Sequence, residues 1–129
     1  MVVSGSGNVA TYAIEKCHEL GAKVIACSDS QGIIVDENGI DLKALKQIKE
    51  VERRRISAYT EIHKTAKYVG GGNIWSVPCD VALPCATQNE LNANDAKILV
   101  ENGCIAVAEG ANMPTTPEGI LLFQDAKIC

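Results

Sequence analysis

The first 30 residues show the apolar and polar pattern of a strand, a helix and a second strand. Residues 2–3 form a short apolar run that leads into a glycine-rich turn. The next segment has helical period, because Val9, Ala13 and Cys17 fall on one face while charged residues fall on the other. Residues 24–27 form a second apolar run, short and bounded by polar residues, which is typical of a strand buried on both faces of a parallel sheet. The pattern predicts a βαβ unit.

Strand and helix patterns continue to alternate through the rest of the chain. Asp41 is a suitable N-cap for an amphipathic helix that begins at Leu42. A glycine triplet at residues 70–72 marks the longest loop. The last helix is expected to begin with a capping box formed by Thr115 and Glu118. The remaining predicted elements are strands at residues 33–35, 81–83 and 105–108, an amphipathic stretch at residues 56–66, and helices at residues 94–101 and 116–126.

This alternation predicts an α/β fold. We expect a Rossmann-like, doubly wound, mainly parallel sheet with helices on both faces, in which residues 2–4 and 24–27 form neighbouring parallel strands. The sequence shows no internal repeat and no interdomain linker, and 129 residues suit one domain with a conventional buried core.

Composition narrows the function classes. With 47% hydrophobic residues, 22% charged residues and a net charge of −4, the chain is typical of a soluble globular domain, and its negative charge argues against a nucleic-acid partner. No apolar run reaches the roughly 20 residues of a membrane helix, so we expect no membrane partner. The six cysteines lack CxxC or zinc-type spacing. We interpret them as reduced thiols, which predicts a cytoplasmic protein without a metal site.

A glycine-rich turn separates the first strand from the first helix. Its sequence, SGSGNVA at residues 4–10, fits the GxGxxA pattern of dinucleotide-binding turns. Gly5 suits a tight turn, Gly7 leaves room for a pyrophosphate against the backbone, and Ala10 lets the helix pack closely on the sheet. Free N–H groups at the helix start favour phosphate. The motif therefore indicates a dinucleotide-binding domain rather than an ordinary strand-to-helix turn.

An acidic residue follows the second strand at the expected distance. Asp29 lies 24 positions after Gly5, where its carboxylate could accept hydrogen bonds from adenosine ribose hydroxyls and would repel a 2′-phosphate. Alone, Asp29 predicts NAD. The basic segment from Lys49 to Arg55 could supply cations to a 2′-phosphate, with Ser30 as a further donor, although a charge run is usually a solvated surface. These residues leave the choice between NAD and NADP open.

Amide side chains follow two later strands. Gln88 lies after the predicted strand at residues 81–83, and Asn112 lies after the one at residues 105–108. Ligands of doubly wound sheets bind beyond the carboxyl ends of strands, and an amide matches both the donor and the acceptor of a nicotinamide carboxamide. As turn formers, these residues would need no ligand. No His or Lys stands at a strand end beside an acidic partner, so we expect no catalytic residue in the chain.

Four segments are specific enough to compare with known families. They are SGSGNVA at residues 4–10, CSDSQG at residues 27–32, DVALPCATQNEL at residues 80–91 and AVAEGANMPTT at residues 106–116. Together they resemble the cofactor domain of hexameric, NADP-linked glutamate dehydrogenases, and the resemblance covers essentially the whole chain. It implies part of an enzyme that transfers a hydride between L-glutamate and NADP to give 2-oxoglutarate and ammonia, with NAD as a possible cofactor.

The resemblance also implies roles for individual residues. It implies that Asn8 and Val9 contact the pyrophosphate and that Asp29 and Ser30 contact the adenosine ribose. Lys49 and one of Arg53, Arg54 and Arg55 would face the 2′-phosphate. The nicotinamide ribose and ring would be surrounded by Ala86, Thr87, Gln88 and Asn112. The remaining candidate cofactor-binding residues are Ser4, Gly5, Ser6, Gly7 and Gly110, and from the basic segment Arg53 is the candidate arginine.

The family pattern extends beyond both ends of the chain. The resemblance implies that a substrate domain with the catalytic lysines and aspartate would precede Met1, and that a further segment would follow Cys129. We therefore expect residues 1–129 to be a partial dinucleotide-binding domain, inactive alone, of a homohexameric parent enzyme. The alternative is a regulatory Rossmann domain that senses NAD(H) or an adenosine nucleotide without catalysis. The two amide-bearing loops favour the dehydrogenase, since a sensor of adenosine nucleotides does not need them.

Overall fold

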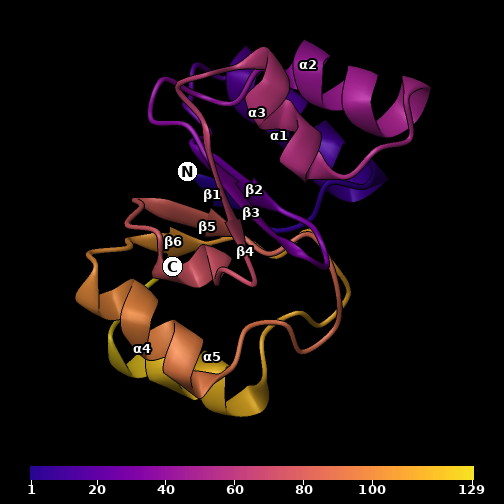
Figure 1. Cartoon of the computed structure of the whole chain (residues 1–129). Helices are drawn as coiled ribbons and strands as arrows, with labels where there is room; N and C mark the ends of the chain where they lie inside the picture. Colours follow the sequence, from indigo (N-terminus) through magenta and orange to yellow (C-terminus); the bar gives the residue numbers. More distant parts are fainter.

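The protein is built on a six-stranded sheet (Figure 1). The computed structural model describes residues 1–129. Along the sheet the order is β4-β3-β2-β1-β5-β6, and the four strands from β2 to β6 in this order run parallel to one another. The strands are β1 (Val2–Val3), β2 (Ala26–Ser28), β3 (Gly32–Val35), β4 (Lys67–Gly70), β5 (Val81–Leu83) and β6 (Ala106–Val107). The chain first extends the sheet to one side of β1 and then to the other, as in a doubly wound fold.

Helices cover both faces of this sheet (Figure 1). One layer holds α1 (Asn8–Glu19), α2 (Leu42–Lys46) and α3 (Tyr59–Ile62), and the other holds α4 (Ala93–Glu101) and α5 (Pro117–Asp125). A π-helical turn (Gln47–Val51) continues α2, and short 3₁₀ turns lie at Ile56–Ala58 and Ile74–Ser76. The predicted α/β architecture with helices on both faces is confirmed.

Neighbouring residues of the central strands serve different layers of the core. Val3 and Cys27 pack in the cluster that contains residues of α1 and α2. Val2 and Ala26 pack in a second cluster with residues of α4 and α5. Because side chains alternate across a strand, a strand covered on both faces must be apolar at every position. This explains why short continuous apolar runs, and not alternating ones, mark these strands in the sequence.

The third strand runs in the opposite direction from the one expected. Residues 33–35 do belong to a strand, but β3 pairs antiparallel with β2, with Cys27 opposite Ile34. Only residues 29–31 connect the two strands. A connection this short can join only antiparallel neighbours, because a parallel pair needs a crossover of a dozen or more residues. The expectation that strands and helices alternate throughout is therefore wrong at this point, although three of the five pairings in the sheet are parallel.

The edge strand β4 is missing from the sequence-based prediction. It pairs antiparallel with β3 from Gly32 opposite Gly70 to Val35 opposite Lys67. The expected glycine loop therefore begins only after Gly70. Three of the four residues of β4 are exposed, and its two central apolar residues, Tyr68 and Val69, directly precede the glycine triplet, so the sequence shows only a weak strand pattern. The pattern at residues 56–66 resolves into a 3₁₀ turn and the short α3.

Two predicted helix starts can be compared with the structure. Asp41 is the N-cap of α2 as expected, and its side chain accepts hydrogen bonds from the N–H groups of Lys43 and Ala44. The capping box expected from Thr115 is wrong by one residue. Thr116 is the N-cap of α5 and accepts from the N–H of Gly119 at 3.2 Å, while the Thr115 hydroxyl is buried without a partner.

The cap at Asp41 predicts a measurable pH dependence of stability. Burial tends to raise the pKa of Asp41, but the Ala44 N–H, the His63 side chain and the Lys43 N–H outweigh it and hold the pKa below its ordinary value of 3.8. A lowered folded-state pKa contributes stability above about pH 3.8, and this stability is lost as the pH falls through the folded pKa. We expect Asp41→Asn, which keeps a cap acceptor, to lower the free energy of unfolding at pH 7 by less than about 1 kcal/mol.

Urea unfolding at several pH values measures this difference. Wild type and Asp41→Asn should converge in strong acid, where both side chains are uncharged. If the two proteins differed in unfolding free energy by the same amount at every pH, the lowered pKa of Asp41 would be contradicted.

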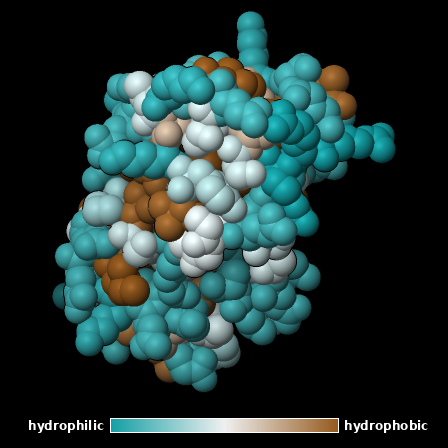
Figure 2. Space-filling model, in the orientation of Figure 1, coloured by the Kyte–Doolittle hydropathy of each residue, from teal (hydrophilic) through white to brown (hydrophobic).

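The surface is mainly hydrophilic on the face shown in Figure 2, with small separate patches of apolar residues. No helix combines the length and the apolar character that crossing a membrane requires. All six cysteines are free thiols, and four of them (Cys17, Cys27, Cys85 and Cys104) are buried.

Candidate functional site

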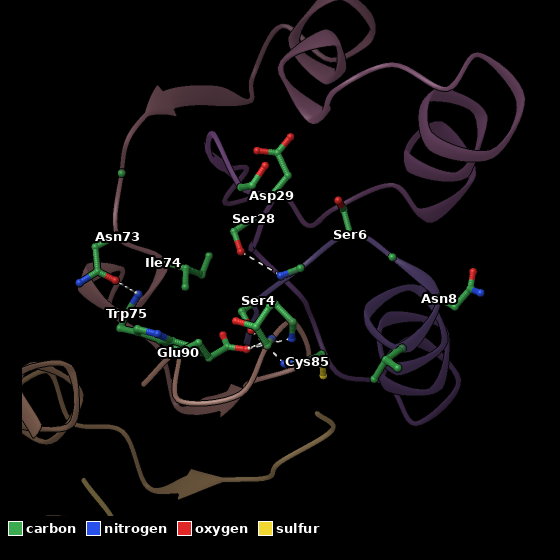
Figure 3. Close-up of a pocket in the computed structure, with 17 residues that line it drawn as sticks. Ser4, Ser6, Asn8, Ser28, Asp29, Asn73, Ile74, Trp75, Cys85 and Glu90 are labelled. Carbon is green, nitrogen blue, oxygen red and sulfur yellow. Dashed lines mark hydrogen bonds between the residues drawn. The ribbon is translucent and has the colours of Figure 1, made fainter. Parts of the chain in front are cut away.

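A pocket of about 620 Å³ opens at the carboxyl ends of β1, β2 and β5 (Figure 3). This size is typical of ligand pockets, and the position is the crevice where a doubly wound sheet reverses its strand order. Ten of the residues singled out in the sequence line it: Ser4, Gly5, Ser6, Gly7, Asn8, Val9, Asp29, Ser30, Ala86 and Thr87. The glycine-rich turn, the turn after β2 and the loop after β5 thus meet at one place.

The two glycines of the turn serve different purposes. Gly5 has a left-handed φ of +89°, and a Cβ there would lie 3.2 Å from the Cβ of Ala86. Gly5 therefore makes the tight turn and allows the loop after β5 to approach the backbone closely. Gly7 has an ordinary φ of −83°, and a Cβ there would meet nothing within 4 Å. Its missing side chain leaves open space in the pocket.

The first turn of α1 presents unpaired backbone donors to this space. Gly7 is the N-cap and offers no side-chain acceptor, and the first N–H to bond back is that of Thr11, which donates to the Gly7 carbonyl at 2.9 Å. The N–H groups of Asn8, Val9 and Ala10 have no acceptor within the chain. The first turn carries no acidic residue. Unpaired donors at the positive end of a 12-residue helix suit a phosphate group.

Two serine hydroxyls join the ends of the three central strands (Figure 3). The Ser28 Oγ accepts a hydrogen bond from the Gly5 N–H at 2.9 Å, which links β2 to the glycine-rich turn. The Ser4 Oγ accepts from the Cys85 N–H at 2.9 Å, which links β1 to β5. Ser4 is only 2% exposed. Its hydroxyl therefore shapes the pocket wall.

Asp29 lies in the turn between β2 and β3, and its carboxylate is already engaged. Oδ1 accepts from the N–H groups of Gln31 (2.8 Å) and Gly32 (3.0 Å), which closes the turn. Oδ2 accepts from the N–H of Ile56 at 3.3 Å. Hydrogen bonds to a charged group stabilise the charge and occupy its acceptor sites. Ribose hydroxyls would therefore compete with backbone donors at both oxygens.

Only one of the three consecutive arginines reaches the pocket rim. Arg55 Nη1 donates to Ser30 Oγ at 3.0 Å. Arg54 instead forms ion pairs with Glu52 and Glu61 on the outer surface. Arg53 is exposed, has a left-handed φ of 54° and does not line the pocket. The geometry thus favours Arg55 over Arg53 as the arginine of the site.

Lys49 lies in the π-helical turn and does not line the pocket, but it acts on the same region as Asp29. Burial raises the pKa of the Cys27 thiol to about 12, the nearby Asp29 carboxylate adds to the rise, and the Lys49 ammonium opposes it. Both charges are therefore within electrostatic reach of Cys27, at the end of β2. Lys49 and Asp29 thus act with opposite charge on the same buried thiol.

Glu90 fixes the loop after β5 (Figure 3). Its Oε2 accepts from the N–H groups of Ala86 (2.9 Å) and Thr87 (2.7 Å). Burial, together with the charge of Glu90 and the neighbouring Cys17, raises the pKa of Cys85 to about 11, against the effect of the Gly110 N–H. The three titratable side chains that line the pocket are Asp29, Cys85 and Glu90. Asp29 and Glu90 are carboxylates that accept from backbone donors, and the raised pKa keeps the Cys85 thiol protonated at neutral pH.

Three further candidates from the loops after β5 and β6 lie outside the pocket lining. Gln88 and Asn112 are exposed. Gly110 packs directly behind the lining, because a Cβ there would lie 2.5 Å from Cys85 Sγ and 3.4 Å from a methyl group of Val9. The loop after β6 therefore supports the pocket from behind.

Several residues of the pocket were not predicted from the sequence. Ser28 directly precedes Asp29 at a strand end, and this position was a usable signal. Glu90 acts through backbone contacts that its sequence position does not indicate. The far wall of the pocket comes from the segment after β4 and consists of Gly72, Asn73, Ile74 and Trp75. Because β4 was not predicted, the position of this segment could not be predicted either. Asn73 is held there by its Nδ2, which donates to Asp95 Oδ1 at 2.8 Å.

Comparison with known proteins agrees with this geometry. The chain is 58% identical over 130 residues to a glutamate dehydrogenase of Bacteroides thetaiotaomicron, covering 98% of this chain and 29% of that protein. It is 55% identical over 133 residues to an NADP-specific glutamate dehydrogenase of Helicobacter pylori, covering 98% of this chain and 30% of that protein. The chain thus spans less than a third of the length of these relatives.

The fold is also shared with a solved structure. The crystal structure of Plasmodium falciparum glutamate dehydrogenase superposes with a TM-score of 0.94 at 47% identity, covering 98% of this chain and 28% of the other. The family model for Glutamate/Leucine/Phenylalanine/Valine dehydrogenases matches residues 1–129. The chain belongs to this dehydrogenase family.

Proposed function

We propose that the chain is the NADP-binding part of a glutamate dehydrogenase, which transfers a hydride between L-glutamate and NADP to give 2-oxoglutarate and ammonia. The observation that carries the proposal is the pocket at the reversal of strand order, with an open space at Gly7 facing the unpaired N–H groups of α1. Several relatives, including those of Helicobacter pylori and Escherichia coli, are named NADP-specific glutamate dehydrogenases.

The cofactor would lie across the pocket in one direction. The N–H groups of Asn8 and Val9 would hold the pyrophosphate. The adenosine ribose and its 2′-phosphate would lie at the rim where Arg55 contacts Ser30. Lys49 would be a further cation for the 2′-phosphate, as the family resemblance implies. The nicotinamide end would lie toward the loop that contains Ala86 and Thr87, with the exposed Gln88 and Asn112 and the supporting Gly110 beyond them, as the family resemblance implies.

The residues at the rim favour NADP over NAD. Three backbone N–H groups share the charge of Asp29, which lessens its repulsion of a 2′-phosphate. Arg55 and Ser30 offer charge-assisted donors in the same place, and NAD has no group that would need them. NAD remains the second choice, since one relative, from Xylanibacter ruminicola, is named NAD(P)-specific.

Within this proposal, the chain binds the cofactor and other parts of a longer enzyme carry out the chemistry. The pocket lining holds no His or Lys, and its two carboxylates accept from backbone donors, so we expect no glutamate oxidation by the 129-residue chain. The substrate domain of the parent chain would complete the site, and the parent would be a cytoplasmic homohexamer. The free thiols are consistent with a reducing compartment.

Calorimetric titration of the chain with NADPH and NADH tests the proposal. We expect both to bind and NADPH to bind more tightly, with no turnover of glutamate. Binding of adenosine nucleotides with no gain from the nicotinamide half would favour a regulatory nucleotide sensor instead. Binding of no dinucleotide at all would refute the proposed function.

Exchange of individual arginines tests the assignment at the rim. Arg55→Ala should weaken NADPH binding about tenfold, because it removes one charge-assisted contact to the 2′-phosphate, and should change NADH binding little. Arg54→Ala is the matched control. It removes the same charge from the chain, but Arg54 is paired with Glu52 and Glu61 on the outer surface. Equal effects of the two variants, measured by the same titration, would mean that only the net charge of the segment matters.

A further inference from the structure

Two contacts fasten the turn after β2 to the segment that carries the arginines. The N–H of Ile56 donates to Asp29 Oδ2 at 3.3 Å, and the guanidinium of Arg55 donates to Ser30 Oγ at 3.0 Å. Asp29 and Ser30 are adjacent, and so are Arg55 and Ile56. Two neighbouring residues of one segment therefore bind two neighbouring residues of the other, although 25 or more positions separate them in the chain.

Two backbone hydrogen bonds hold the segment around Arg55 to its own side of the fold: the Arg54 N–H donates to the Ile48 carbonyl at 2.8 Å, and the Arg55 carbonyl accepts from the Ala58 N–H at 3.1 Å. Arg55 is extended (φ −74°, ψ 157°) and precedes a single 3₁₀ turn, and its side chain is exposed. The Ile56 side chain is buried in the core, which holds the chain at that point but does not orient the preceding residue. The Ile56 N–H is the backbone group next to Arg55, and Asp29 Oδ2 is its acceptor. The carboxylate thus ties the backbone beside Arg55 to the turn after β2, where the guanidinium also contacts Ser30.

We propose that Asp29 is a positioning residue for NADP selection, which holds Arg55 at the place of the 2′-phosphate. This role rests on the cofactor function proposed above. In this role Asp29 favours NADPH binding, whereas an acidic residue at the end of the second strand is expected to oppose it. A free carboxylate there would repel the 2′-phosphate, whereas a carboxylate that accepts three backbone N–H groups keeps a cation in place, and the dipoles of these groups partly offset its charge.

The variant Asp29→Asn separates these two roles. Asparagine keeps one oxygen acceptor for the N–H groups of Gln31 and Gly32, so the turn after β2 can still close. Its amide nitrogen is a donor and would face the Ile56 N–H, which removes the contact that directs Arg55. The change therefore releases the arginine while the fold is retained, and thermal unfolding verifies that the fold is intact.

The experiment is calorimetric titration with NADPH and NADH of wild type, Asp29→Asn, Arg55→Ala and the double variant. We expect Asp29→Asn to weaken NADPH binding about five- to tenfold and to change NADH binding less than about twofold. In the Arg55→Ala background, Asp29→Asn should have almost no further effect on NADPH, because the residue it positions is gone. Glu61→Gln is the control, since it removes one carboxylate from the other side of the same segment.

Each other outcome overturns the inference. Tighter NADPH binding by Asp29→Asn would mean that the carboxylate acts by repulsion. Weaker NADH binding would mean that it accepts from the ribose hydroxyls. If Asp29→Asn weakened NADPH binding as much in the Arg55→Ala background as in wild type, or if Glu61→Gln weakened it equally, Asp29 would not act through Arg55. If wild type bound neither dinucleotide, the proposed function would fail and the inference with it.

Discussion

Gly7→Ser is expected to weaken NADPH binding about a hundredfold while leaving the protein at least as stable as wild type. Gly7 has a φ of −83°, which any residue adopts, and open space lies where a side chain would project. Serine is a better N-cap than glycine, by a few tenths of a kcal/mol, because its hydroxyl accepts from the N–H groups of the first helical turn. The same hydroxyl would occupy the donors and the space that the pyrophosphate needs, and charge-assisted bonds of this kind contribute about 1.5 to 3 kcal/mol each.

The measurement pairs calorimetric titration with urea unfolding of the same preparations. Gly5→Ala is the contrasting variant, because Gly5 has a φ of +89° and a Cβ there would crowd Ala86. It should lose stability as well as affinity. Unchanged NADPH affinity in Gly7→Ser would place the pyrophosphate elsewhere.

Gly32→Ala is expected to lower the free energy of unfolding by about 3 kcal/mol. A Cβ at Gly32 would lie 2.5 Å from the carbonyl oxygen of Val69 and 2.7 Å from the Tyr68 hydroxyl. The tyrosine can rotate away, but the carbonyl belongs to the backbone of β4 and can move only if the strand shifts. The hairpin turn that holds Asp29 is adjacent, so NADPH affinity should fall as well.

Gly70→Ala provides a control at the facing position. Gly70 is the register partner of Gly32, yet a Cβ there would meet nothing closer than 3.7 Å, on the Tyr68 ring. Urea unfolding should show a loss below about 1 kcal/mol for this variant. Similar losses at the two positions would contradict the packing of β4 against β3.

The central part of the fold is readable from sequence because local and global signals agree there. The apolar pairs at residues 2–3 and 26–27 must be buried on both faces, and the glycine-rich turn between them fits only a strand followed by a helix. Ten of the candidate residues line the pocket, because they follow strands whose carboxyl ends meet at one edge. The glycine motif and the position after a strand were sufficient for the turn and for Asp29, whereas Ala86 and Thr87 came from the family resemblance. Position after a strand alone also selected Gln88 and Asn112, which do not line the pocket.

The parts that sequence did not predict depend on contacts between distant segments. The direction of β3 follows from a three-residue turn closed by Asp29, and an acidic residue at a strand end can equally be a ligand or a turn former. The choice among the three arginines follows from ion pairs of Arg54 with Glu61 and from the reach of Arg55 to Ser30. A run of identical charged residues does not indicate which side chain turns toward the pocket, because the three arginines have the same chemistry and all three are exposed.

The serine hydroxyls that join the ends of β1, β2 and β5 have a consequence for how fast a ligand can be accepted. Both bonds, from Gly5 to Ser28 and from Cys85 to Ser4, form within the chain and need no ligand. The pocket is therefore preorganised, and little conformational entropy remains to be lost when a dinucleotide arrives. For the dinucleotide proposed above, we therefore expect association limited by diffusion and accelerated by the field of the basic segment.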